Sequence, residues 1–228
     1  FNNNQGLIDG FVSIINNTGT AIVRTSYMGT NGNDQVFGIQ FDANGYPYVM
    51  GQTTGTWPVT AGTPTFGSST GKQFIAKLQP DLSAFVYSTV FGTNSNIPNI
   101  SPIAFLIDRC ENVYISGWGG AGFGTGFTSA GTNGLPVTPD AFKSVTDGRD
   151  FYFFVMKKDA TAQLFGSFFG ENNSVNNGYD HVDGGTSRFD RSGVIYQAIC
   201  ANCEIGGIRP SFPTQPPGVW SSNNPANT

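Results

Sequence analysis

One short pattern occurs three times in this chain and constrains its fold more than any other feature. It runs from Asp42 to Tyr48, from Asp108 to Tyr114 and from Asp190 to Tyr196. Each copy has an Asp that ends one apolar run, then a turn, then a Tyr in the next apolar run. Because each copy of a repeated sequence is one structural unit that stacks on its neighbours, the pattern indicates a repeat architecture.

Other landmarks recur in the same order around this pattern. An aromatic-rich strand lies before each copy, and a second apolar run follows it and ends at Gly29, Gly92 or Gly170. A Pro-Thr signature lies after each copy, at 57–60, 135–139 and 212–216. Each repeat therefore predicts four short strands separated by turns rich in Asn and Gly, in the first repeat at about 11–16, 21–28, 36–42 and 47–52.

Four antiparallel strands per repeat, with connections of variable length, are typical of a β-propeller blade. We therefore expect an all-β fold with three four-stranded antiparallel blades, at approximately residues 7–66, 72–142 and 150–220. A β-sandwich and a β-solenoid are the alternatives, although solenoid coils are usually shorter than these units. Since propellers typically have roughly four to eight blades, residues 1–228 are expected to be a segment of a larger propeller.

Composition limits the partners of the chain. The net charge is −4, the pI is about 4.7, and Lys and Arg are scattered along the chain, singly except for Lys157 and Lys158. Nucleic-acid binding is not expected, because it requires a basic surface that neutralises phosphates. No membrane span is expected, because no run approaches the roughly 18 apolar residues that a transmembrane helix requires.

Three cysteines are present, Cys110, Cys200 and Cys203. A zinc site would need a fourth ligand, and the sequence has a single His, His181. A redox Cys-x-x-Cys motif would need a helix start in a βαβ context, which the sequence lacks. The sequence therefore favours a structural disulfide in an exported protein, and all three pairings remain open.

Candidate binding residues lie in the connections. Trp118 lies among glycines and is a candidate exposed platform for a ligand such as a sugar, whereas Trp57 and Trp220 are expected in the core. The loops at 30–34, 93–99 and 171–180 contain oxygen-bearing side chains suitable for calcium, but few acids, so solvated turns without a cofactor are expected.

The single His lies between two acids, as a catalytic base would. Asp180 and Asp183 flank His181, but no nucleophile elbow accompanies them, so a structural hydrogen-bonding role is expected. No pair of opposed carboxylates for glycoside hydrolysis can be nominated from the sequence. The chain is therefore not expected to be an enzyme.

The repeats resemble a known family. The Asp-x-x-Gly-x-x-Tyr pattern, the Pro-Thr signature and the strand at 74–78 resemble the SBBP-type β-propeller repeat. The longer strings at 112–120, 134–142 and 181–190 are similar to large bacteroidete cell-surface proteins with PKD-type modules and a gliding-motility-type sorting domain. The chain departs from the repeat at Glu111, where the pattern has Gly.

The resemblance implies secretion by the type IX route, display at the bacterial cell surface, and a role in adhesion or gliding motility. It implies no catalytic residues. The expected function is therefore that of a non-catalytic structural or adhesive propeller region. Its expected partners are other domains of the same large protein and a surface polysaccharide or protein ligand. The alternative is a carbohydrate-binding or polysaccharide-hydrolysing propeller with its site in the blade loops.

Overall fold

The computed structural model describes residues 3–120, 129–170, 180, 187–190 and 192–199. These residues form strands β1 to β13 and one short 3-10 helix, η1 (Lys158–Ala160). The strands are arranged in four sheets, and every strand pairing is antiparallel except that of the short strand β5 with β7. The prediction of an all-β fold with antiparallel sheets is confirmed. Within the described residues, no helix is long and apolar enough to cross a bilayer.

Two of the sheets have four or five strands, and we call them the complete sheets; the other two are hairpins of two strands. The β1–β2 hairpin consists of β1 (Gly10–Ile15) and β2 (Ile22–Met28). The 34–92 sheet has the order β3-β4-β6-β7-β5, with β3 (Asp34–Phe41), β4 (Pro47–Thr53), β5 (Phe66–Gly67), β6 (Gln73–Leu78) and β7 (Phe85–Gly92). The 101–169 sheet has the order β11-β10-β9-β8, with β8 (Ser101–Ile107), β9 (Val113–Trp118), β10 (Phe151–Met156) and β11 (Gln163–Phe169). The β12–β13 hairpin consists of β12 (Ser187–Phe189) and β13 (Ile195–Gln197).

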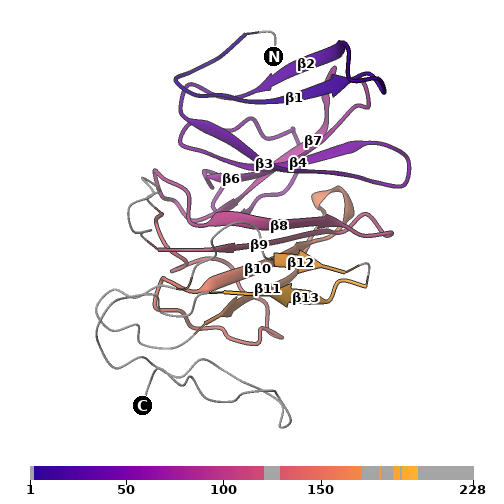
Figure 1. Cartoon of the computed structure of the whole chain (residues 1–228). Helices are drawn as coiled ribbons and strands as arrows, with labels where there is room; N and C mark the ends of the chain where they lie inside the picture. The colour runs from indigo at the N-terminus through magenta and orange to yellow at the C-terminus, as the bar shows by residue number, and fades with distance from the viewer. Residues whose placement is uncertain (1–2, 121–128, 171–179, 181–186, 191, 200–228) are drawn as a thin grey trace.

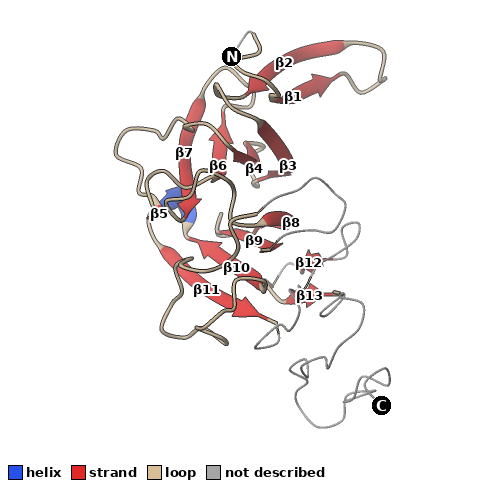
Figure 2. Cartoon of the chain, turned by 90° about the vertical axis from the view of Figure 1, so that its left-hand side faces the viewer, coloured by secondary structure: helices blue, strands red, loops and turns tan. Residues whose placement is uncertain are grey.

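The sheets follow one another in space in the order of the chain. Figure 1 shows the β1–β2 hairpin at the top, then the 34–92 sheet, then the 101–169 sheet, with the β12–β13 hairpin drawn level with β10 and β11. Strand β8 contacts both β3 and β12, so the first strands of successive sheets are neighbours. Figure 2 shows these three strands along one side of the molecule, with β7 and β11 on the other side.

The three Asp-to-Tyr patterns form the same hairpin turn. Oδ1 of Asp42 accepts hydrogen bonds from the backbone N–H groups of Asn44 and Tyr46, at 2.9 and 3.0 Å. Asp108 and Asp190 each accept the two equivalent N–H groups of their own turns. The third residue after the Asp has a positive φ in every copy: Gly45 (82°), Glu111 (65°) and Gly193 (82°).

The strand pairings carry the same irregularities in each repeat. The register shifts between Ile14 and Ile15, between Lys77 and Leu78, and between Val155 and Met156. It also shifts at equivalent places in the β3–β4 and β8–β9 pairings. Because a bulge leaves one residue unpaired at a defined position, these coincidences align the repeats residue by residue. Lys77 thus corresponds to Val155 of β10 and to Ile14 of β1.

The predicted strands of the first repeat are present, but the expectation that they form one sheet is wrong. β1 pairs with β2 alone, whereas β3 and β4 pair with β6 and β7. The sheets therefore span 34–92 and 101–169 and are offset by two strands from the predicted units at 7–66, 72–142 and 150–220. The short connection 29–33 leads from one sheet to the next, whereas the longer connection 54–72 joins two paired strands. Strands that are close in the sequence therefore do not always belong to the same sheet.

Aromatic side chains form the core between the sheets. Phe154 of β10 stacks on Phe91 of β7, with ring centroids 4.5 Å apart, and so joins the two complete sheets. Trp57 stacks on Phe74 at 3.5 Å and donates a 2.7 Å hydrogen bond from Nε1 to Ser88 Oγ. The prediction that Trp57 packs in the core is therefore confirmed, whereas Trp220 lies outside the described residues.

Candidate functional site

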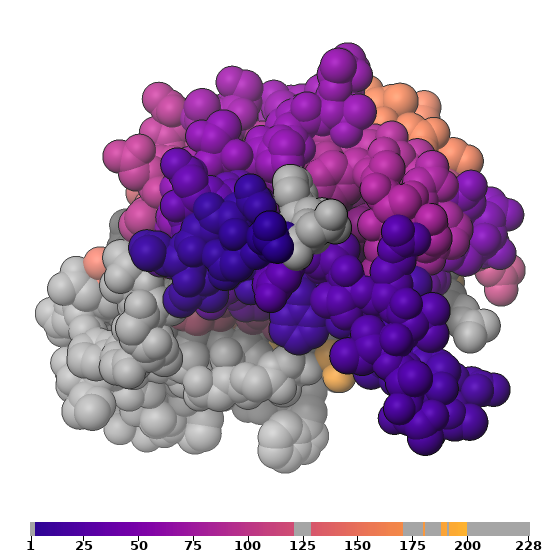
Figure 3. Space-filling view, turned by 90° about the horizontal axis from the view of Figure 1, so that it is seen from above, coloured from indigo at the N-terminus to yellow at the C-terminus, as the bar shows by residue number. Residues whose placement is uncertain are grey.

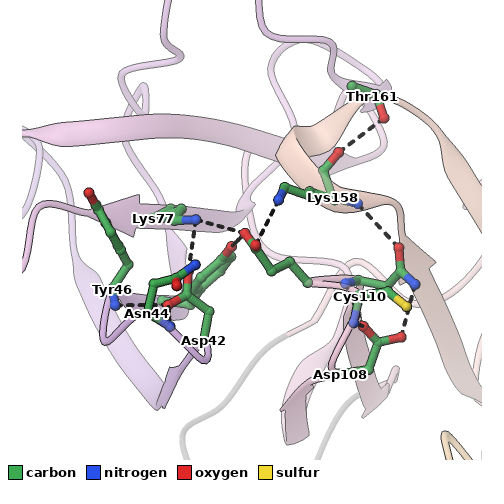
Figure 4. A network of polar contacts seen from close by, with 11 residues as sticks. Asp42, Asn44, Tyr46, Lys77, Asp108, Cys110, Lys158 and Thr161 are labelled. Atoms are coloured by element: carbon green, nitrogen blue, oxygen red, sulfur yellow. Dashed lines mark hydrogen bonds and ion pairs between the residues drawn. The ribbon is translucent and has the colours of Figure 1, made fainter.

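The hairpin turns bring charged side chains of the two complete sheets together. Asp42 directly follows β3, and Glu111 lies in the turn between β8 and β9. Lys77 of β6 is paired with Tyr48 of β4 and reaches toward both acids (Figure 4). Lys158 of η1, which follows β10 at the same end of the 101–169 sheet, approaches Glu111 from the other side. We call these five residues the inter-sheet ion cluster.

Lys77 is the centre of the inter-sheet ion cluster. Its Nζ lies 2.8 Å from Asp42 Oδ2 and 2.9 Å from Glu111 Oε2. Glu111 Oε1 accepts a 2.7 Å hydrogen bond from Lys158 Nζ, and Glu111 Oε2 accepts a 3.2 Å hydrogen bond from the hydroxyl of Tyr48. The side chains of Lys77, Asp42 and Glu111 are 8, 0 and 12 % exposed, so this charge balance is made largely out of water.

Two tyrosine rings complete the surroundings of the Lys77 ammonium group. Nζ lies 4.8 Å from the ring centroid of Tyr46 and 5.0 Å from that of Tyr48. A cation at this distance over an aromatic face is attracted by the ring quadrupole. Lys77 therefore has favourable partners on several sides, and these offset the loss of its hydration.

The pKa values follow from these contacts. Burial alone would lower the pKa of Lys77, but its hydrogen bonds to Asp42 and Glu111 outweigh burial and raise it. Burial would raise the pKa of Asp42, but Lys77 and two backbone N–H groups lower it. Lys158 and Lys77 lower the pKa of Glu111, whereas burial raises the pKa of Tyr48 to about 12. Both carboxyl groups are held as ion-paired anions, an arrangement that suits fixing one sheet to the next.

Glu111 adopts a backbone conformation that its repeat position normally assigns to glycine. Its φ is 65°, where the equivalent residues are Gly45 and Gly193. The left-handed conformation costs an L-residue about 1–2 kcal/mol. Strain at a non-glycine residue persists when its surroundings require it, and here the carboxylate holds Lys77 and Lys158. The presence of Glu111 where the repeated pattern has Gly was the one sequence signal of the inter-sheet ion cluster. The other sequence patterns did not predict it.

Two substitutions separate this strain from the ion pairs. We expect Glu111→Ala to be less stable than Glu111→Gly by about 1 kcal/mol, because glycine adopts the positive φ without strain. Both variants lose the carboxylate between the two lysines and are expected to be less stable than the parent chain. Urea unfolding of the three proteins measures these differences. Equal stability of the Ala and Gly variants would contradict the proposed strain.

The inter-sheet ion cluster also predicts an acid dependence of stability. The ordinary pKa values of Asp42 and Glu111, 3.8 and 4.5, are lowered by folding. Their contribution is therefore complete above these values and is lost as the pH falls through the lower folded values. Burial raises the pKa of Asp150, so its protonation acts in the opposite direction. The stability difference between the parent chain and Lys77→Met is expected to shrink between pH 7 and pH 3, measured by urea unfolding; an unchanged difference would contradict this assignment.

Trp118 is not the exposed platform that the sequence predicted. It is 7 % exposed and packs with Phe151, against Ile103, Phe169 and Ile199. Its backbone is paired with Ser101 on one side and with Phe151 on the other, so it lies inside the 101–169 sheet. The neighbouring glycines indicated exposure, but side chains of β8, β10 and β11, together with Ile199, pack against it.

The cysteine predictions have different outcomes. Cys110 is an exposed free thiol at the β8–β9 turn. The pairings that join it to Cys200 or Cys203 are therefore not formed. The third pairing, Cys200 with Cys203, lies outside the described residues.

The loops considered for calcium use their oxygens internally. Asp34 accepts hydrogen bonds from the backbone N–H and the hydroxyl of Thr30, and Asn99 accepts equivalent bonds from Thr93. Asp180 is buried, while His181, Asp183 and residues 171–179 lie outside the described residues. In the described part of the chain, no three His, Cys, Asp or Glu side chains are grouped to hold a metal ion.

Comparison with known proteins adds no relative. No protein-family model matches the chain. No curated protein matches its sequence either. The resemblance to the SBBP-type repeat therefore depends on the sequence motifs alone.

Proposed function

We propose that this chain is a region of a β-propeller with a non-catalytic, structural or adhesive role in a secreted bacterial protein displayed at the cell surface. The supporting observation is the equivalence of the two complete sheets. They share the order of four antiparallel strands, to which the 34–92 sheet adds β5, and they share the positions of their bulges and the Asp-centred turn. The contacts of β8 with β3 and β12 agree with first strands that surround a common axis.

The connections differ between the two ends of the sheets. The tight β3–β4, β6–β7 and β8–β9 turns lie at the end that carries the inter-sheet ion cluster. The connections 54–72 and 119–150 join the opposite strand ends, as do the links between successive sheets. Binding residues are disproportionately found on loops held by a rigid scaffold, so we place the adhesive surface at this second end. Its proposed ligand is a surface polysaccharide or protein, and its other partners are domains of the same large protein.

The observations favour a scaffold over a polysaccharide hydrolase. The aromatic platform expected of the carbohydrate-binding alternative, Trp118, is buried. The carboxylates of Asp42 and Glu111 are neutralised by lysine, whereas a glycosidase needs an acid and a base that flank the scissile bond. In a structural role, the buried Trp118 contributes to the core and the ion-paired carboxylates join the two complete sheets.

The proposed adhesive surface is tested through its exposed apolar residues. Phe142 and Val145 are 60 and 72 % exposed on the 119–150 connection. The chain is passed over immobilised bacterial surface polysaccharides and proteins, and both retention and released reducing ends are measured. We expect the chain to be retained without release of reducing ends. The double variant Phe142→Ser with Val145→Ser is expected to bind at least tenfold more weakly. The control Arg109→Ser, at the opposite end of the sheets, is expected to bind as tightly as the parent chain. Release of reducing ends, or equal binding by the double variant, would overturn this proposal.

A further inference from the structure

A second buried contact between a lysine and an aspartate belongs to the 101–169 sheet. Figure 3 looks onto the end of the molecule that carries the indigo β1–β2 hairpin, and in this view the 101–169 sheet lies behind the 34–92 sheet. Lys143 Nζ is 2.7 Å from Asp150 Oδ1, and the two side chains are 12 and 2 % exposed. Asp150 directly precedes β10, whereas the backbone of Lys143 is hydrogen-bonded to Ser167 and Phe168 of β11. The contact therefore reaches across β11 to the start of β10.

Gly170, directly after β11, makes room for this contact. Lys143 Nζ donates a 3.2 Å hydrogen bond to the carbonyl oxygen of Gly170. A Cβ at Gly170 would collide with both Asp150 Oδ1 and Asp180 Oδ2. The two carboxyl groups therefore lie side by side over the same glycine, and both aspartates are 1 % exposed.

The surroundings of Asp150 favour its neutral form. Burial raises the pKa of Asp150 and outweighs the nearby Lys143, which lowers it. Among the described residues, the buried Oδ2 of Asp150 has no hydrogen-bond partner. A charged group with too few partners in a dry site becomes neutral. Transfer of a proton from Lys143 to Asp150 gives an uncharged amine in contact with an uncharged carboxyl group, and a desolvated amine is a nucleophile.

The Lys77–Asp42 contact in the other complete sheet lacks these properties. Asp42 Oδ1 accepts two backbone N–H groups, and Lys77 lies between two carboxylates and two tyrosine rings. These contacts stabilise both charges, and an ammonium group has no lone pair with which to attack a carboxyl carbon. The Lys77–Asp42 contact is therefore expected to remain an ion pair and is a matched comparison within the same chain.

We propose that Lys143 and Asp150 become joined by an amide bond between their side chains in the folded protein. The uncharged Nζ of Lys143 attacks Cγ of the protonated Asp150 carboxyl group, and the bond between Nζ and Cγ forms. The bond between Cγ and one carboxyl oxygen breaks. That oxygen leaves as water, with its own proton and one proton from Nζ. The reaction requires no other reactant.

The geometry supplies what this condensation needs. Two groups held in contact react as in a unimolecular step, which removes most of the entropic cost of bringing them together. Asp180 is placed to carry the proton from Nζ to the leaving oxygen, because its carboxyl group lies beside that of Asp150. Exclusion of water from the buried site protects the product from hydrolysis.

The amide bond would close a ring that holds part of the 119–150 connection on the sheet. Phe142 directly precedes this ring, and Val145 lies within it. The inference depends on the contact between Lys143 and Asp150, and not on the proposed adhesive role. Once joined, Asp150 no longer titrates. The stability difference between the parent chain and Lys77→Met is unaffected, because both chains carry the bond.

The intact mass of the reduced 228-residue chain tests this proposal. We expect the parent chain to be lighter than its sequence by the mass of one water molecule. Asp150→Ala and Lys143→Arg are expected to have their full sequence masses, and Lys143→Arg keeps a cation beside Asp150 so that the surroundings are preserved. A parent chain of full mass, or the same loss of water in these variants, would overturn the proposal.

Trypsin digestion locates the loss of water. Trypsin cleaves after an unmodified Lys143, whereas the amide removes its charge and is expected to prevent this cleavage. Fragments 110–149 and 150–157 are then released as one branched species. Cleavage after Lys77 is the control and is expected to be complete. A loss of water confined to one linear fragment, such as cyclisation of Asp147 onto the backbone nitrogen of Gly148, would overturn the proposed bond.

A time course tests the role of Asp180. The chain is made by cell-free synthesis, and its mass is followed from the moment of folding. Asp180→Asn is expected to form the bond at least about tenfold more slowly, because an amide does not accept the proton. Asp140→Asn, which changes an exposed acid of the same connection, is the control and is expected to react at the parent rate. Equal rates in Asp180→Asn and the parent chain would overturn the assignment of Asp180.

Discussion

Replacement of Lys77 by Met is expected to lower the free energy of unfolding by about 3–5 kcal/mol, the usual cost of removing one partner from a buried ion pair. The substitution leaves the carboxylates of Asp42 and Glu111, which are 0 and 12 % exposed, without their shared cation. Met keeps most of the aliphatic volume, so the loss reports the charge rather than a cavity. Urea unfolding at pH 7, monitored by tryptophan fluorescence and circular dichroism, measures it.

A matched substitution and a double variant make this test specific. Lys157→Met makes the same chemical change at an exposed position and is expected to alter stability by less than about 0.5 kcal/mol. In a Glu111→Gln background, Lys77→Met is expected to cost at least about 1 kcal/mol less, because the two residues are directly coupled. Equal effects of Lys77→Met and Lys157→Met, or additivity of the double variant, would contradict the inter-sheet ion cluster as a stabilising contact.

The sequence predicted the local structure well because the local signals are strong. The Asp of each repeated pattern holds two N–H groups of its own turn, so its side chain and the turn are specified within a few residues. Trp57 was predicted to lie in the core because it belongs to the Pro-Thr signature, and the structure agrees. These features depend on neighbours in the sequence.

Features that depend on partners from other repeats could not be predicted in the same way. Lys77 and Glu111 belong to different sheets and meet only because the β3–β4 and β8–β9 turns lie at the same end. Sequence similarity does not identify the counterpart of the lysine either. Lys157 follows an aromatic run much as Lys77 does, but the strand register places Val155 at the position equivalent to Lys77. The predicted boundaries of the sheets were wrong for a related reason. A repeating sequence has the same period whichever of its four strands is the first strand of a sheet, so the period alone does not show where each sheet begins.

The two complete sheets are joined by different forces at different depths. The inter-sheet ion cluster lies at the turn end, where Lys158 is 47 % exposed and water is close. The aromatic contacts of Phe154 lie in the middle of the interface, where Phe91 and Phe154 are fully buried. Charge therefore fixes how the sheets are aligned, whereas apolar burial supplies the larger part of their attraction. Removing the central aromatic ring should accordingly weaken the interface at any pH.

Phe154→Ala is therefore expected to lower the free energy of unfolding by about 3–5 kcal/mol, the range measured for buried Phe-to-Ala substitutions. Phe154 stacks on Phe91 at 4.5 Å and meets Phe66 edge-on at 5.4 Å, so the substitution opens a cavity between two sheets. Urea unfolding measures the loss, with Phe142→Ala as the control at a ring that is 60 % exposed. Unlike that of Lys77→Met, this loss should persist between pH 7 and pH 3. A loss below about 1.5 kcal/mol would mean that the site collapses around the missing ring, or that Phe154 does not join the two sheets.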